Sequence, residues 1–261
     1  MTPAPVLFIS HGAPTFAIEP GKLGPQLQTL GTRLTGVRAV LVVSPHWQTR
    51  DVQVMATPQP ETVHDFGGFP ARLYALRYPA TGAPQWAAQA AERLLQAGFA
   101  THMDTQRGLD HGAWVPLLHL LPQAQIPVFQ VSMPFSLTTT QAVALGRALA
   151  PLREQGVMIV GSGSMTHNLH EFRLSATNEA AYVREFAAWV RQAVLADAAD
   201  TLADYRRLAP HAARAHPTEE HFLPLLIAVG ANAGESAART IADEITYGVL
   251  SMESYAWGLA D

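Results

Sequence analysis

Short apolar segments alternate along the chain with longer segments rich in Ala, Leu, Gln and Arg. The short segments are almost continuously hydrophobic, which is typical of strands buried on both faces of a mostly parallel sheet. They predict strands over residues 5–10, 39–45, 51–56, 126–133 and 156–163. The longer segments predict helices over residues 22–34, 84–97, 138–152, 179–196 and 219–229. This alternation indicates an α/β fold in which helices flank a central, mostly parallel sheet.

No internal repeat, low-complexity tract or linker divides the 261 residues, so we expect a single domain over residues 1–261. Pro84, Pro151 and Gly98 lie where such residues mark helix ends. The proline-rich segment 56–84 is long for a connection. Long irregular loops in compact domains are often functional, so this segment is a candidate part of a site.

Composition and charge exclude several classes of function. The formal net charge is -4 and Lys22 is the only lysine, so the chain has no basic surface for nucleic acid. The absence of cysteine excludes disulfides, thiolate nucleophiles and sulfur-bound metals. No segment approaches the roughly 18 consecutive apolar residues of a membrane span, and the start MTPAPVLFIS lacks the positive region of a signal peptide. We therefore expect a cytoplasmic protein that binds neither nucleic acid nor membrane.

Three of the 11 histidines follow predicted strands. His11 comes directly after the first strand, His46 comes after the second, and His167 follows the last one after a Gly/Ser turn. Ligands of open α/β sheets bind outside the carboxyl ends of the strands. We therefore expect these three imidazoles to meet in one crevice at that edge of the sheet.

Two further histidines are candidates for the same site. His111 stands beside Asp110, where a loop becomes an apolar segment, and His221 is expected in the first turn of the last helix with Thr218 as its N-cap. Neutral imidazole suits zinc, copper, iron and nickel. Two or three histidines with open coordination positions are typical of a catalytic metal site.

The other histidines have no such placement. We expect His102 and His211 at the surface, His119 on an apolar helical face, and His216 in the loop before the last helix. The Gly/Ser turn 161–165, GSGSM, has neither the spacing of a serine nucleophile elbow nor the lysine of a phosphate-binding loop. The histidines therefore carry the strongest chemical signal in the sequence.

Seven motifs occur in an order that resembles one enzyme family. They are SHGAPT, VVSPHW, HDFGGFP, LDHGAWVPL, GSGSMTHNL, AHPTEEHFLPLL and YGVLSMESYAWG. Together they resemble the class III extradiol ring-cleavage dioxygenases, and within these the 4,5-DOPA extradiol dioxygenase subgroup. The resemblance extends from about residue 6 to residue 258. Each motif alone is only moderately specific, and the ordered set is specific.

This resemblance implies an α/β fold that binds non-haem Fe(II), or Zn(II) in some preparations. It implies an enzyme that opens the ring of a small catechol with O2 to a muconate-semialdehyde-type product. Carried onto this sequence, the metal ligands of the family fall on His11, His46 and His221, and its acid/base histidine falls on His167. We assign His111 as a second catalytic candidate that contacts substrate or oxygen.

Some roles stay open at the level of sequence. Related enzymes use a glutamate as the third ligand, so Glu219 or Glu220 could assist the metal beside His221. His64 and Asp65 could line the entrance or orient a ligand histidine, or they could stabilise their loop through an Asx turn. A zinc-dependent hydrolase and a non-catalytic binding protein on the same scaffold are the alternative functions. The sequence indicates no oligomeric state.

Overall fold

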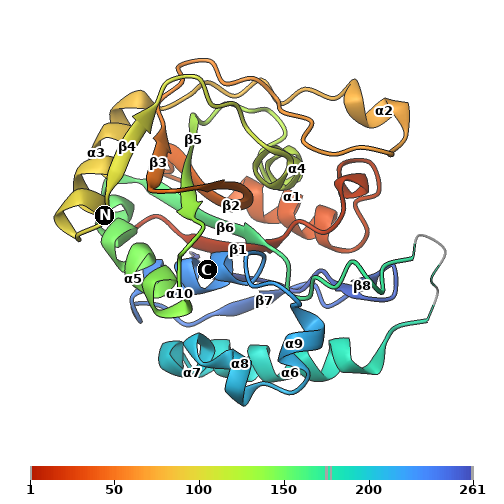
Figure 1. Cartoon of the computed structure of the whole chain (residues 1–261). Coiled ribbons are helices and arrows are strands. Elements are labelled where there is room, and N and C mark those ends of the chain that lie inside the picture. Colours follow the sequence, from red (N-terminus) through yellow and green to blue (C-terminus); the bar gives the residue numbers. More distant parts are fainter. Residues whose placement is uncertain (1, 174–175, 177, 260–261) are drawn as a thin grey trace.

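The computed structural model describes residues 2–173, 176 and 178–259, and its centre is an eight-stranded sheet (Figure 1). The strand order is β4-β3-β5-β2-β6-β1-β10-β7. These strands are β1 (Val6–Ser10), β2 (Ala39–Thr49), β3 (Val52–Met55), β4 (Thr101–Asp104), β5 (Val128–Pro134), β6 (Val157–Gly163), β7 (Arg239–Ile241) and β10 (Ser254–Trp257). A small second sheet consists of β8 (Ile245–Thr246) and β9 (Leu250–Ser251).

The middle of the sheet is parallel. Strands β5, β2, β6 and β1 all run in one direction, whereas β3 is antiparallel to β5, and β10 is antiparallel to both β1 and β7. Every residue of β1 and β6 is buried, as expected for strands covered on both faces. The predicted α/β fold with a mostly parallel sheet is therefore confirmed.

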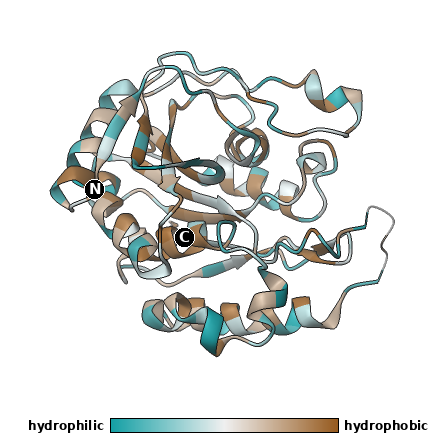
Figure 2. Ribbon diagram, viewed as in Figure 1, coloured by the Kyte–Doolittle hydropathy of each residue, from teal (hydrophilic) through white to brown (hydrophobic). Residues whose placement is uncertain are grey.

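Helices cover both faces of the sheet. They are η1 (Pro14–Ala17), α1 (Leu23–Arg33), α2 (Ala71–Tyr74), α3 (Pro84–Gln96), α4 (His111–Leu120), α5 (Thr139–Leu149), η2 (Ala150–Gln155), α6 (Ala181–Leu195), α7 (Ala199–Ala203), α8 (Tyr205–Leu208), α9 (Ala212–Ala215) and α10 (Leu223–Asn232). Helices α1 and α4 pack together on one face, α3, α5 and α10 pack on the other, and α7 contacts α5 and α10 from outside. Figure 2 shows hydrophobic residues gathered in the strands and in α10. Among the described residues, no helix has both the length and the apolar character needed to cross a bilayer.

Most predicted helices are present with small shifts at their ends. The predicted helix 138–152 ends at Leu149, two residues before Pro151, and the chain continues as the 3-10 helix η2 with Pro151 in its first turn. The last predicted helix begins four residues late, at Leu223. Helix α4 is not among the predicted helix ranges, although His119 is expected on an apolar helical face, because its residues are apolar nearly all round and Pro116 lies inside it. The apolar periodicity that identifies an amphipathic helix is therefore missing there.

The close approach of α5 and α10 depends on glycine. A Cβ atom on Gly146 would lie 2.0 Å from the carbonyl oxygen of Ile227, and one on Gly230 would lie 2.1 Å from that of Val143. These distances are far below van der Waals contact, so neither position accepts a side chain without movement of a helix. This packing holds α10 close against α5.

Candidate metal centre

His11 stands at the carboxyl end of a central strand, as predicted. It follows β1 directly, its side chain is buried, and its backbone N–H donates to the carbonyl of Gly163 at 2.9 Å. Gly12 then adopts a φ of +61°, and a Cβ atom there would lie 2.7 Å from the sulfur of Met252. Glycine is therefore required for the chain to turn away and leave the imidazole at the sheet edge.

His46 lies inside a strand and not after it, which corrects the expectation from the sequence. Strand β2 continues to Thr49, and its pairing with β5 shifts register between Val43 and Gln48. The Ser44 hydroxyl accepts the N–H of His46 at 3.2 Å within this irregular stretch. Such irregularities re-aim side chains beside active sites. The direction of the His46 ring therefore cannot be read from the regular alternation of side chains between the two faces of a strand.

His221 reaches the same place from the turn before α10. The expected N-cap role of Thr218 is wrong, because α10 begins at Leu223 and the Thr218 hydroxyl donates to Glu220 at 2.9 Å. The carbonyl of His221 accepts the N–H of Ser164 at 2.9 Å. This bond fixes the turn to the chain that leaves β6, and with it the His221 ring.

These three imidazoles converge on one point. The Nε2 atoms of His11 and His46 are 3.2 Å apart, and one ring nitrogen from each of His11, His46 and His221 lies within 4.8 Å of the others. The Nε2 atom of His221 is buried and has no hydrogen-bond partner. Two nitrogen ligands about 2.1 Å from one ion lie roughly 3.0–3.4 Å apart at octahedral or tetrahedral angles. The three residues therefore fit a divalent transition metal.

Hydrogen bonds to the Nδ1 atoms, on the far side of the rings from the shared centre, fix the tautomers of His11 and His221. Ser162 donates its hydroxyl hydrogen to the carbonyl of Gly112, so at 2.9 Å it accepts the Nδ1–H of His11. The carboxylate of Glu220 lies 3.1 Å from the Nδ1 of His221 and accepts its hydrogen. A hydrogen on Nδ1 leaves the lone pair on Nε2, which is the nitrogen that points to the shared centre.

The glutamates beside His221 therefore have distinct partners. Glu219 forms an exposed ion pair with Arg206 at 3.2 Å. Glu220 contacts the outer nitrogen of His221 and also lies within 4.8 Å of a ring nitrogen of His167. In this arrangement Glu220 contacts the outer side of the His221 ring, and Glu219 faces the surface.

His167 flanks the three imidazoles. Its ring stacks on that of His221, with 3.4 Å between centroids and 10° between planes. Its backbone N–H donates to the carbonyl of Ala215 at 2.8 Å. His216 is fully buried next to this segment, and its Nε2 lies 2.9 Å from the carbonyl of Met165. His216 lies between α9 and α10, in the loop before the last helix as expected from the sequence.

His111 flanks the site from the other side, as the first residue of α4. The Asp110 side chain caps this helix by accepting the N–H of Ala113 at 3.2 Å. The rings of His111 and His46 are 3.9 Å apart between centroids. Asp65 accepts the backbone N–H of His111 at 2.9 Å, and its other oxygen lies 3.0 Å from the Nδ1 of His111 and 3.6 Å from that of His46.

Asp65 thus approaches the site, whereas its neighbour His64 has a different partner. The Nε2 of His64 lies 3.1 Å from the carbonyl of Leu76, within the same long loop. Arg77 donates to that carbonyl as well, and Arg72 pairs with Glu19 at 3.8 Å on the exposed surface. Of the two candidates in the HDFGGFP motif, Asp65 contacts the histidine cluster.

Burial keeps the imidazoles neutral. Burial, together with repulsion from His111, lowers the pKa values of His46 and of His167 to about 4. Burial and then the neighbouring imidazoles hold the pKa values of His11 and His221 well below the usual range. Burial raises the pKa of Asp65, but the contacts with His111 outweigh this effect and lower it to about 2. Near neutral pH the site therefore offers neutral nitrogen ligands beside an ionised carboxylate.

The metal-free protein should lose stability between about pH 7 and about pH 5. Burial lowers the pKa of His46 and His167 to about 4 and of His216 to about 3, whereas imidazole in an unfolded chain titrates near about 6.5. Below that pH the unfolded chain takes up protons that the folded chain excludes. The free energy of unfolding should then fall by roughly 1.4 kcal/mol per pH unit for each such histidine. Urea unfolding at the two pH values measures this, and equal stability at both would contradict it.

The remaining histidines lie away from the cluster, as expected. His102 is exposed and lies 3.6 Å from Asp51. His211 is paired with a surface glutamate at 2.8 Å. His119, in α4, lies 2.8 Å from the carbonyl of Phe16. None of these three belongs to a group of described residues that could hold a metal ion.

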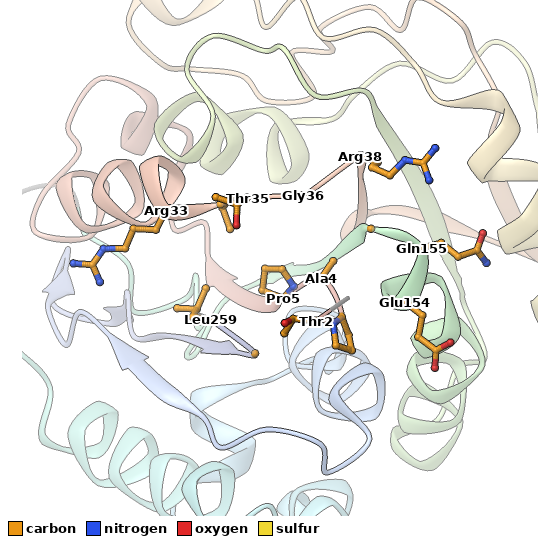
Figure 3. A pocket seen from close by; sticks show the side chains of 14 residues that line it. Thr2, Ala4, Pro5, Arg33, Thr35, Gly36, Arg38, Glu154, Gln155 and Leu259 are labelled. Carbon is orange, nitrogen blue, oxygen red and sulfur yellow. The ribbon is translucent and has the colours of Figure 1, made fainter. Parts of the chain in front are cut away.

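A separate hollow lies at the opposite edge of the sheet (Figure 3). Its lining includes Pro5, Arg38 and Gly156, which precede β1, β2 and β6 respectively. Its lining side chains include arginines and a glutamate but no histidine. Every group of described residues that could hold a metal ion includes His46 or His221, at the carboxyl edge.

Comparison with known proteins places this site in context. Residues 6–256 match the family described as the catalytic LigB subunit of aromatic ring-opening dioxygenase. The 4,5-DOPA dioxygenase extradiol of Beta vulgaris is 39% identical over 252 residues, covering 95% of this chain and 94% of that protein. The Escherichia coli K12 protein of the same name is 36% identical, covering 97% and 94%. A crystal structure of an uncharacterized Escherichia coli K12 protein superimposes with a TM-score of 0.80 at 30% identity, covering 97% of this chain and 99% of that one.

Proposed function

This chain belongs to the family of the catalytic LigB subunit of aromatic ring-opening dioxygenases, and we propose that it opens the ring of a small catechol in extradiol fashion at a metal held by His11, His46 and His221. The convergence of these three imidazoles carries the proposal, with two Nε2 atoms 3.2 Å apart and the third buried without a partner. The family match over residues 6–256 supports a single catalytic domain over residues 1–261.

We take Fe(II) as the active metal and Zn(II) as the ion acquired in air. For nitrogen-rich sites the general affinity order places zinc above iron. When bound, Fe(II) supplies Lewis acidity toward the catechol hydroxyls and redox chemistry toward O2. Three protein ligands leave coordination positions open for small molecules, as in other catalytic metal sites.

The two flanking histidines handle protons and substrate. His167 is half-buried, and its pKa of about 4 leaves it neutral near pH 7, so its ring can accept a proton from a catechol hydroxyl and return it later in the reaction. Its stacking on His221 holds it beside the metal position without making it a ligand. His111 lies against Asp65 through Nδ1, which leaves its Nε2 as the acceptor for a substrate hydroxyl or for O2-derived groups.

The relatives support a DOPA-like catechol as the substrate class. The Beta vulgaris, Portulaca grandiflora and Escherichia coli proteins, named as 4,5-DOPA dioxygenases, are 35–39% identical to this chain over at least 93% of their length. Cleavage beside one hydroxyl of such a catechol would give a muconate-semialdehyde-type product. The complete set of His11, His46, His221 and His167 argues against a scaffold that has lost its activity.

Protein purified in air should carry zinc or little metal and should consume no O2 with catechols. Anaerobic reconstitution with Fe(II) should start O2 uptake, because redox chemistry requires iron. The assay offers DOPA, caffeate, protocatechuate and simple catechol to the iron-loaded protein, and it follows O2 uptake together with the yellow semialdehyde product. Zinc-loaded protein is the control. An iron-loaded protein that consumes no O2 with any catechol would overturn the proposed function.

A further inference from the structure

Asp65 is shared by two imidazoles of the site. Its Oδ2 lies 3.0 Å from the Nδ1 of His111 and 3.6 Å from the Nδ1 of His46, and its Oδ1 accepts the backbone N–H of His111 at 2.9 Å. The Nδ1 of His111 has no partner in linear hydrogen-bond geometry. The carboxylate therefore stands between the two rings, close to both.

A fixed segment of the long loop carries Asp65 to this position. The backbone of Val63 donates to the carbonyl of Leu109 at 2.8 Å, and Leu109 donates to Glu61 at 2.8 Å. The indole N–H of Trp114 donates to the carbonyl of Val63 at 2.9 Å. These bonds tie the loop to both sides of the start of α4. Asp65 is therefore held against His111 by main-chain contacts two residues before it.

The other side chains behind the ligand histidines make different contacts, and Glu220, which is 3.1 Å from the His221 ring, lies only within 4.8 Å of a ring nitrogen of His167. Ser162 joins the ring of His11 to a backbone carbonyl. Glu220 forms its 3.1 Å contact with the ring of His221 and a bond with Thr218. One oxygen of Asp65 lies 3.0 Å from the Nδ1 of His111 and 3.6 Å from that of His46, so it is close to one metal-facing histidine and to one histidine outside the ligand set.

We propose that Asp65 is a positioning residue that orients His46 toward the metal and His111 toward the substrate as one unit. The inference rests on the proposed function in taking His46 as a ligand and His111 as a substrate contact. Carboxylates behind ligand histidines fix ring orientation, and their loss typically costs about 10–100-fold in metal affinity or activity. Here one substitution affects both rings, so metal affinity and catechol binding both depend on Asp65.

The test compares Asp65→Asn, which keeps the shape but not the charge, with Asp65→Ala and Asp65→Glu. The matched control is Asp51→Asn, which removes a carboxylate 3.6 Å from the exposed His102. Chelator competition gives the Co²⁺ dissociation constant of each full-length protein, without any turnover. At saturating Fe(II), O2 uptake gives KM and kcat for catechol. Asp65→Asn and Asp65→Ala should weaken Co²⁺ binding by about 10–100-fold and raise KM, with partial recovery in Asp65→Glu, whereas Asp51→Asn should match the wild type.

A second comparison separates the two rings. His111→Ala should raise KM but bind Co²⁺ as the wild type does, and adding Asp65→Ala to it should weaken Co²⁺ binding with little further rise in KM. Co²⁺ affinity unchanged in both Asp65→Asn and Asp65→Ala would overturn the proposal. So would two Co²⁺ ions per wild-type chain with one lost in Asp65→Ala, because Asp65 would then be a ligand. If wild-type iron-loaded protein consumes no O2, the proposed function fails, and the Co²⁺ measurements still decide the role of Asp65 at His46.

Discussion

Replacing His167 with alanine is expected to lower kcat by about 10²–10⁴-fold, the usual contribution of a general acid–base group, while the protein keeps its metal. The His167 ring stacks face to face on His221, and His11, His46 and His221 form a three-nitrogen site without it. Measurement of kcat by O2 uptake, together with metal content by mass spectrometry, checks both halves of the expectation.

His170→Ala is the matched control for His167→Ala. His170 is exposed and lies three residues further along the same segment. Its hydrogen bonds, with Asn168 and Arg173, are made by its backbone N–H and carbonyl groups. It should match the wild type in kcat and in metal content. If His167→Ala lost its metal along with its activity, His167 would be a ligand, and the division between ligands and the acid/base residue would be wrong.

Replacing His11, His46 or His221 with alanine should remove the metal itself. Each variant loses one of three nitrogen ligands, so its metal affinity should fall by more than the roughly 10–100-fold that the loss of an outer partner costs. Competition with a chelator measures the dissociation constant for Co²⁺ or Zn²⁺. The exposed His102 provides the control. Its imidazole contacts Asp51 and belongs to none of the groups of described residues that could hold a metal ion.

These three alanine variants should also fold. His11 and His221 are buried histidines whose pKa values are held low by burial, so replacing either ring removes a group that the unfolded chain solvates better. Thermal unfolding of the metal-free variants separates loss of metal binding from loss of structure. A folded His46→Ala protein that binds metal as tightly as the wild type would contradict the assignment of His46.

Much of the fold follows from local sequence. Strands buried on both faces appear as continuous apolar segments, which is why β1 and β6 are predicted within one residue of their ends. The position of His11 follows as well, because it depends only on where β1 ends. Helix α4 escapes prediction for the opposite reason, since it is buried almost all round and its sequence has no polar face.

The parts of the site that depend on distant contacts could not be predicted. The direction of His46 depends on a register shift against β5, a pairing partner far away in the sequence. Helix α10 starts at Leu223 without a cap from Thr218, after a turn in which the His221 carbonyl accepts the N–H of the distant Ser164. The contact of Asp65 with two imidazoles depends on how its loop is tied to α4. Each of these three features depends on contacts between residues far apart in the sequence, so no local sequence pattern predicts it.

The central claim is that His11, His46 and His221 together hold one catalytic metal at the carboxyl edge of the sheet. Anomalous diffraction at the iron edge, from crystals of protein loaded anaerobically with Fe(II), tests it most directly. The account predicts one strong peak within bonding distance of the Nε2 atoms of all three residues. A strongest peak between Asp65 and His111, or on the surface with the three imidazoles empty, would contradict it.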